Sequence, residues 1–310
     1  MDRLQASLTH NLGPTIMAAL HDPDVIEIMV NPDQTLWIEK LGQDMALCGT
    51  LPPAQSRLII SLVASALETT VTAEHPIVEG ELPLDGSRFE GLMPPIVSGP
   101  SFTIRKRASR VFTLDDYVAS GILLQAASDI LTRAIETRRN ILAVGGTGSG
   151  KTTFVNAIID GISRHCPTDR LIIIEDTAEL QSASENTVFM RSSDGVPIQR
   201  LVKVSMRYRP TRILVGEVRD GSALDLLKAW NTGHPGGVAT VHAGSAAAGL
   251  LRLEQLIAEA TPVPMPALIA EAVDMICFIE RAPGGRRVSD IVTVNGFDPA
   301  TRSYDLEHLC

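Results

Sequence analysis

The stretch that decides the fold runs from Ile141 to Thr153 and reads ILAVGGTGSGKTT. It starts as an apolar strand and then matches G-x-x-x-x-G-K-[ST] in full, from Gly145 to Thr152. A helical pattern, TTFVNAIIDGI, follows directly, so N–H groups of the loop and of the helix start can point at phosphate oxygens. The alternative is an ordinary glycine turn beside a solvated lysine. The strand and helix that flank the motif argue against it.

We predict that this loop binds ATP together with Mg²⁺. Lys151 is expected to reach the β and γ phosphates, and the hydroxyl of Thr152 is expected to ligate the metal ion. The residues expected to contact the nucleotide are Gly145, Gly146, Thr147, Gly148, Ser149, Gly150, Lys151, Thr152 and Thr153.

Two further apolar runs each lead into an acidic residue. LIIIEDTAEL, Leu171 to Leu180, presents Glu175, and RILVGEVRD, Arg212 to Asp220, presents Glu217. Groups just past the carboxyl ends of neighbouring parallel strands share one crevice, which predicts that both acids face the loop. Glu175 is then expected to orient or deprotonate a water, and Glu217 to hold the metal. For each acid the alternative is a solvated side chain after a buried strand.

The segment NTGHPGGVATVHAGSA, Asn231 to Ala246, contains two histidines on either side of a short apolar strand. A lone histidine is more often structural, but His234 and His242 could sense phosphate or couple hydrolysis to motion. Their spacing matches no metal-binding pattern such as H-E-x-x-H.

The chain of 310 residues is long enough for two domains. Alternation around a turn predicts a hairpin over Val25–Glu39, and helical spacing predicts a helix over Gln55–Leu67. The basic run RKRASR indicates a linker. The predicted division is an α+β N-terminal domain over residues 1–104, a linker over 105–110 and an α/β domain over 111–310.

After the linker, short apolar runs alternate with helical segments, which predicts right-handed crossovers and a mainly parallel sheet. Thr113 and Asp116 could cap the first helix of this region. A Gly284-Gly285 turn predicts a late hairpin. The predicted strands and helices are Ala126–Arg138, Ile141–Val144, Phe154–Ile162, Leu171–Ile174, Arg200–Arg207, Ile213–Val215 and Ala223–Trp230.

Composition narrows the possible functions. Apolar residues make up 45% and charged residues 20% of the chain, as in folded soluble proteins. The net charge of -9 argues against broad capture of nucleic acid, which needs many cations. The four cysteines lie far apart, which signals neither a zinc site nor a disulfide framework. No secretion signal and no membrane-spanning run is found in the sequence.

These motifs occur in the order GGTGSGKTT, IEDTAEL, ILVGEVRD and TGHPGGVATVHAGSA. Together they resemble the secretion and conjugation ATPases of type II, type IV and pilus systems. The segment DGSRFEGLMPPIVSGPSFTIRKR, Asp85 to Arg107, resembles the family region that carries arginines at the domain junction. Size and the lack of zinc-binding cysteines favour the shorter type IV branch, and within it the TrbB-like conjugal transfer ATPases.

The resemblance implies a RecA-like P-loop domain, a smaller N-terminal domain, a hexameric ring and ATP hydrolysis. It also implies inner-membrane partners in a secretion channel and a cytoplasmic location, peripheral at the inner membrane. By motif position, Glu175 is the catalytic glutamate, Glu217 the Walker B acid and His242 the phosphate-linked histidine. Arginines expected near the nucleotide are Arg88 and Arg105, with Arg207 and Arg219 at further family positions, although each could equally be solvated or salt-bridged.

Two other functions stay open at this point. A RecA-like motor that threads single-stranded nucleic acid would need basic residues with stacking aromatics, and aromatics make up only 4% of this chain. A nucleotide-binding scaffold without useful turnover is the second. The presence of Lys151, Glu175 and Glu217 together argues against it.

Overall fold

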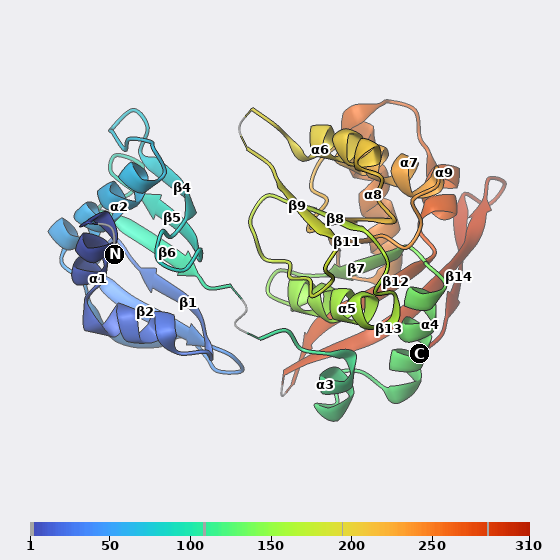
Figure 1. Cartoon of the computed structure of the whole chain (residues 1–310), viewed down its shortest axis with the longest axis horizontal. Helices are drawn as coiled ribbons and strands as arrows, with labels where there is room; N and C mark the ends of the chain where they lie inside the picture. The colour runs from blue at the N-terminus through green and yellow to red at the C-terminus, as the bar shows by residue number, and fades with distance from the viewer. Residues whose placement is uncertain (1–2, 108–109, 194, 284) are drawn as a thin grey trace. The chain divides into compact units, whose positions relative to one another are not determined.

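The computed structural model describes residues 3–107, 110–193, 195–283 and 285–310 (Figure 1). The chain divides into two compact units, Met1–Arg110 and Val111–Cys310. Among the residues described, no helix combines the length and the apolar character that crossing a membrane requires.

The N-terminal unit is an antiparallel sheet covered by two helices. Its strand order is β3-β2-β1-β6-β5-β4. The helix α1 (Arg3–His21) buries Leu8, Leu12 and Ile16, a spacing of one helical turn, and packs on α2 (Pro53–Ala66). The strands are β1 (Val25–Val30), β2 (Thr35–Lys40), β3 (Ala46–Thr50), β4 (Ile77–Glu81), β5 (Arg88–Leu92) and β6 (Ser101–Arg105).

The basic run predicted as a linker begins inside this unit. Arg105 ends β6, where it pairs in register with Glu27 of β1. Lys106 donates from its ammonium to the carbonyls of Ala19 and Asp22, both at 3.3 Å or less. Arg107 forms an ion pair with Glu81 at 2.8 Å. The predicted start of the linker at 105 is therefore corrected, because these cations are bonded to the N-terminal unit. Residues 108–109 of the predicted linker lie outside the described residues.

The C-terminal unit is built on an eight-stranded sheet in the order β14-β13-β12-β7-β11-β10-β8-β9. The strands from β12 to β9 in this order are parallel, and β13 and β14 extend the sheet antiparallel. Their bounds are β7 (Ile141–Gly145), β8 (Leu171–Glu175), β9 (Thr187–Arg191), β10 (Arg212–Val215), β11 (Val238–His242), β12 (Met275–Ala282), β13 (Gly285–Asp298) and β14 (Ser303–His308).

Both faces of this sheet are buried, as a parallel sheet requires. Successive residues of β7 belong to different cores: Leu142 and Val144 pack on one side, Ile141 and Ala143 on the other. One face is covered by α3 (Leu114–Ala119), α4 (Gln125–Glu136) and α5 (Lys151–His165). The other is covered by α6 (Ile198–Ser205), α7 (Ser222–Asn231), α8 (Ala246–Ala260) and α9 (Pro266–Ala272), and a short 3-10 turn, η1 (Met206–Tyr208), follows α6.

Most of the predicted elements are confirmed. The Val25–Glu39 hairpin is β1–β2, and the late hairpin is β12–β13, although Gly284 of its predicted turn lies outside the described residues. Thr113 and Asp116 form a reciprocal capping box at the start of α3. No prediction covers α1, where Gly13 and Pro14 interrupt the helical pattern, or the half-exposed strand β9. The helices α8 and α9 were not predicted either.

Candidate functional site

The glycine-rich loop connects β7 to α5 at the carboxyl edge of the parallel strands. Gly148 and Gly150 have φ of 66° and 95°, left-handed values that residues with a Cβ rarely adopt. Gly150 is the N-cap of α5, and no side chain caps this helix. The helix start therefore offers backbone N–H groups and a partial positive charge at the loop, an arrangement that suits phosphate.

Lys151, the first residue of α5, folds back over this loop. Its ammonium donates to the carbonyls of Gly145 and Gly146, each at 2.9 Å, and lies 3.3 Å from Nδ1 of His242. The residue is only 7% exposed. The loop carbonyls thus hold the lysine charge within the loop, where phosphate oxygens would replace them as partners.

His242 connects Lys151 to Glu217. It is the last residue of β11 and is paired in register with Gly145 of β7. Its Nε2 lies 2.9 Å from Oε1 of Glu217. An ammonium can only donate and a carboxylate can only accept, so a neutral imidazole with its proton on Nε2 satisfies both neighbours. The contacts thus select one tautomer of His242.

Glu217 lies two residues beyond β10 and has a second partner. Its Oε2 accepts from Arg219 at 2.6 Å, and this hydrogen bond raises the pKa of the Arg219 guanidinium. Arg219 also lies 3.9 Å from Asp176, which bonds the hydroxyl of Ser192. Each carboxylate oxygen has two lone pairs, so Glu217 retains capacity for one more contact on each.

Glu175, the last residue of β8, is 5% exposed. Burial raises the pKa of its carboxyl group above the ordinary value, although hydrogen bonds from Leu180 and Glu179 act in the opposite direction. Both of those backbone N–H groups donate to Oε2 at 3.0 Å. Among the described residues Oε1 takes part in no hydrogen bond. A buried carboxylate with one engaged oxygen suits the orientation of a water molecule.

The hydrogen-bond donors and the oxygen ligands at this edge fit a triphosphate with Mg²⁺. The hydroxyl of Ser149 is buried and has no hydrogen-bond partner in the part of the chain that the structure describes. It lies in the loop beside an uncapped helix start and a lysine ammonium. The predicted metal ligands, the hydroxyl of Thr152 and the carboxylate oxygens of Glu217, are of the hard oxygen type that Mg²⁺ prefers.

Residues 12–282 match the family model "Type II/IV secretion system protein". The chain belongs to this family. A probable conjugal transfer protein TrbB of Sinorhizobium fredii is similar to it, 54% identical over 98% of this chain and 93% of the relative. The VirB11 ATPase of Brucella suis, solved in complex with sulphate, is 26% identical with a TM-score of 0.51, and 97% of each chain is covered. The pilus retraction motor PilT with bound ADP shares the fold, at 17% identity and a TM-score of 0.65 over 100% of this chain and 84% of that one.

As in the fold expected for this family, Lys151, Glu175, Glu217 and His242 come from the carboxyl ends of adjacent strands β7, β8, β10 and β11 or from the residues just beyond. Arg219 joins them through Glu217. The structure thus brings together the core of the predicted site. The catalytic and metal-binding roles of these residues stay predictions.

The other predicted residues lie elsewhere. Arg88 and Arg105 are register partners on β5 and β6 of the N-terminal unit, so their reach to a nucleotide stays a prediction. Arg207 lies in η1, next to Tyr208, whose carbonyl accepts from Arg170 at the amino end of β8. Within this chain Arg207 is therefore at the opposite edge of the sheet from Lys151.

The idea that both histidines of the fourth motif act at phosphate is wrong for His234. This residue precedes β11, whereas His242 ends it. Because a strand rises about 3.3 Å per residue, the two lie on the order of 13 Å or more apart, at opposite edges.

Sequence reasoning missed two arginines of the β12–β13 hairpin. Nε of Arg281 donates to the carbonyl of Gly148 at 3.2 Å, and a terminal nitrogen of Arg286 lies 3.5 Å from the same oxygen. The only available signal was the basic composition of ERAPGGRRV, Glu280 to Val288. These cations add positive charge beside the loop.

Proposed function

We propose that this chain is the ATP-hydrolysing motor of a conjugative type IV secretion apparatus. The observation that carries the proposal is the contact series Lys151–His242–Glu217 at the loop, with the buried Glu175 at the end of β8, the strand next to β10. The conjugal transfer relatives and the VirB11 ATPase support the choice of apparatus.

In this proposal the loop amides, the start of α5 and Lys151 bind the phosphates of ATP. Bound Mg²⁺ would neutralise phosphate charge, with Thr152 and Glu217 as its protein-side holders. Lys151 exchanges the carbonyls of Gly145 and Gly146 for phosphate oxygens. Thr147 and Thr153 complete the loop as backbone and hydroxyl donors.

Glu175 orients the attacking water. Its Oε2 is fixed by two backbone N–H groups, which leaves Oε1 to accept a proton from water. The apolar surroundings that raise its pKa also strengthen it as a proton acceptor. Arg88, Arg105 and Arg219 are proposed to stabilise charge on the transferred phosphoryl group.

His242 transmits the state of the site. It touches Lys151 on one nitrogen and Glu217 on the other, so a shift of the ammonium toward phosphate weakens one contact of the imidazole. The change reaches Arg219 and Asp176 through Glu217. We propose that a homo-oligomer, a hexameric ring, uses such changes to act on inner-membrane channel components from the cytoplasmic side.

Steady-state phosphate release in magnesium buffer tests the catalytic part. Wild-type protein is expected to turn over, and Glu175→Gln is expected to bind ATP with little change while losing at least ~100-fold in kcat. Equal turnover by both proteins would remove Glu175 from the mechanism. Absence of nucleotide binding by the wild type would overturn the whole proposal.

Two more measurements separate the motor from the other functions. Light scattering with and without a non-hydrolysable ATP analogue should show an oligomer, and a monomer in both conditions contradicts the ring. Strong, salt-dependent stimulation of hydrolysis by single-stranded DNA would favour a nucleic-acid motor instead.

A further inference from the structure

The edge of the C-terminal sheet opposite Lys151 carries a pocket of about 540 Å³. It is lined by the residues before β8, β9, β10 and β11, together with Arg138 after α4. Three arginines, Arg138, Arg170 and Arg209, contribute to the lining, and no carboxylate does among the described residues. In a chain with a net charge of -9, this local excess of cations is unusual.

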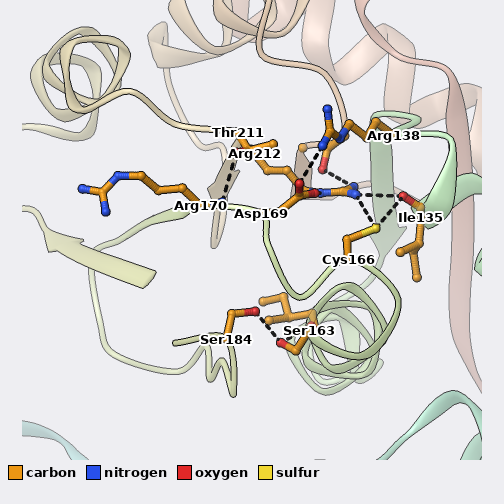
Figure 2. Close-up of polar contacts among 12 residues, drawn as sticks. Ile135, Arg138, Ser163, Cys166, Asp169, Arg170, Ser184, Thr211 and Arg212 are labelled. Atoms are coloured by element: carbon orange, nitrogen blue, oxygen red, sulfur yellow. Dashed lines mark hydrogen bonds and ion pairs between the residues drawn. The ribbon is translucent and has the colours of Figure 1, made fainter. Parts of the chain in front are cut away.

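The carboxylate beside this pocket, that of Asp169, already binds two arginines. Asp169 is 2% exposed, and its two oxygens accept from Arg212 and from Arg138, each at 2.7 Å (Figure 2). Arg212 is 1% exposed and donates further to the carbonyls of Ile135 and Gly236. Only two of the four guanidinium groups at this edge, those of Arg138 and Arg212, contact this carboxylate, and the pocket therefore keeps a net positive charge.

Arg170 and Arg209 have no carboxylate partner in the described parts of the chain. Arg170 donates to the carbonyl of Tyr208 at 2.9 Å and to the side-chain oxygen of Asn186, both neutral acceptors. Arg209 is exposed and takes part in no hydrogen bond or ion pair among the described residues. Figure 2 shows the guanidinium of Arg138 directed toward the Asp169–Arg212 pair and the side chain of Arg170 extending away from it.

Two of these arginines have strained backbones. Arg138 and Arg209 have φ of 54° and 53°, in the left-handed region that residues with a side chain rarely adopt. Such a conformation is unfavourable for a residue with a side chain and persists where the surrounding structure enforces it. Here the fixed neighbours are the Asp169–Arg212 pair and the turn into Pro210, which also lines the pocket.

We propose that this pocket is a second ligand site, separate from the loop at Lys151, for a soluble small molecule that carries two or more phosphate groups. Guanidinium groups bind phosphate through paired N–H donors, and cations spaced around the pocket suit phosphates on different parts of one ligand. The volume is in the range of about 300–1,000 Å³ that small-molecule sites occupy. Pro210 and Pro235 offer an apolar wall.

The probe is pyrophosphate, and its binding is measured by isothermal titration calorimetry. The titration uses Lys151→Ala protein, because this substitution weakens binding at the loop and leaves the second pocket as the main site. Pyrophosphate is expected to bind at one site, more tightly than inorganic phosphate. Arg170→Ala/Arg209→Ala is expected to weaken this binding at least tenfold. Arg209→Ala alone, which removes no contact among the described residues, is expected to weaken it severalfold without loss of thermal stability.

The matched control is Arg252→Ala/Arg302→Ala, which removes the same charge from one half-buried and one exposed position outside the pocket. It should leave the affinity unchanged. Equal weakening by the control, or no heat of binding in the Lys151→Ala protein, overturns the proposal. Binding to phosphatidic acid vesicles without binding to pyrophosphate would identify a lipid headgroup as the source of phosphate and likewise overturn the soluble ligand.

Discussion

The paired side chains at the two edges of the C-terminal sheet differ in how deeply they are buried. At the loop edge, the side chains of Glu217 and His242 are 21% and 42% exposed. At the other edge, those of Asp169 and Arg212 are 2% and 1% exposed. Partly hydrated pairs cost little to break, whereas a buried pair is expensive to leave incomplete. The loop edge can therefore rearrange around a ligand, while the opposite edge stays fixed.

The largest effect is expected at the fixed edge. Asp169→Ala leaves the Arg212 guanidinium buried without a carboxylate, which should cost about 3–5 kcal/mol in the free energy of unfolding. Urea denaturation measures this. Asp160→Ala removes the surface partner of Arg164 and should cost less than ~1 kcal/mol. Similar losses in both variants would contradict the distinction between the two edges.

At the loop edge, the largest effect is expected on activity rather than on stability. Lys151→Ala removes the ammonium that meets the phosphates, and phosphate release should fall at least ~100-fold. The free energy of unfolding should change much less than in Asp169→Ala, because the lysine ammonium contacts neutral loop carbonyls and the partly exposed His242. Lys228→Ala, an exposed lysine of α7, is the control and should keep full activity.

A smaller effect is expected for the connecting histidine. His242→Ala removes the side chain that links Lys151 to Glu217, and kcat should fall by roughly tenfold or more while ATP affinity changes little. His308→Ala breaks another histidine–carboxylate pair, with Asp290 at 2.8 Å, and should not alter kcat. Measurements of nucleotide affinity and kcat on the same variants distinguish a role in turnover from a role in binding. A loss of affinity alone would make His242 a binding residue instead.

The smallest effect concerns stability as a function of pH. Burial raises the pKa of Glu175 in the folded chain, so the folded state holds this proton more tightly than the unfolded state. Stability from the protonated form is complete below the unfolded pKa and is lost as pH rises through the folded pKa.

Glu175→Gln cannot ionise and should therefore unfold at a higher temperature than the wild type at pH 7. The gain should shrink toward pH 4, where the wild type is protonated as well. Thermal unfolding at both pH values measures it, and Glu185→Gln at an exposed position is the control. A gain that is equal at both pH values would point to packing rather than to ionisation.

The residues of the loop edge could be predicted from the sequence for a physical reason. Loop, acids and His242 follow apolar strands directly, and parallel strands bring their carboxyl ends to one edge. The contacts among these residues could not be predicted. Lys151 and His242 are 91 residues apart in the sequence, and no local pattern indicates that they touch. Arg281 and Arg286 were not predicted, because the sequence of a basic hairpin does not indicate which loop the hairpin contacts.

The charged cluster at the opposite edge could not be predicted either, because its contacts also join segments that are distant in the sequence. Asp169, Arg138 and Arg212 come from segments between α4 and β10 with no shared motif, and the sheet order alone makes them neighbours. His234 shows the converse, since it is close to His242 in sequence and a strand length away in space.

By itself, the sequence determined the phosphate-binding loop, the alternation of strands and helices, and the acids that end buried strands, because each depends on contacts within a few residues. Only the tertiary structure decided which charges pair, which become buried and which gather around the second pocket. Those outcomes depend on the order of strands in the sheet, and strand order is set by packing between distant segments.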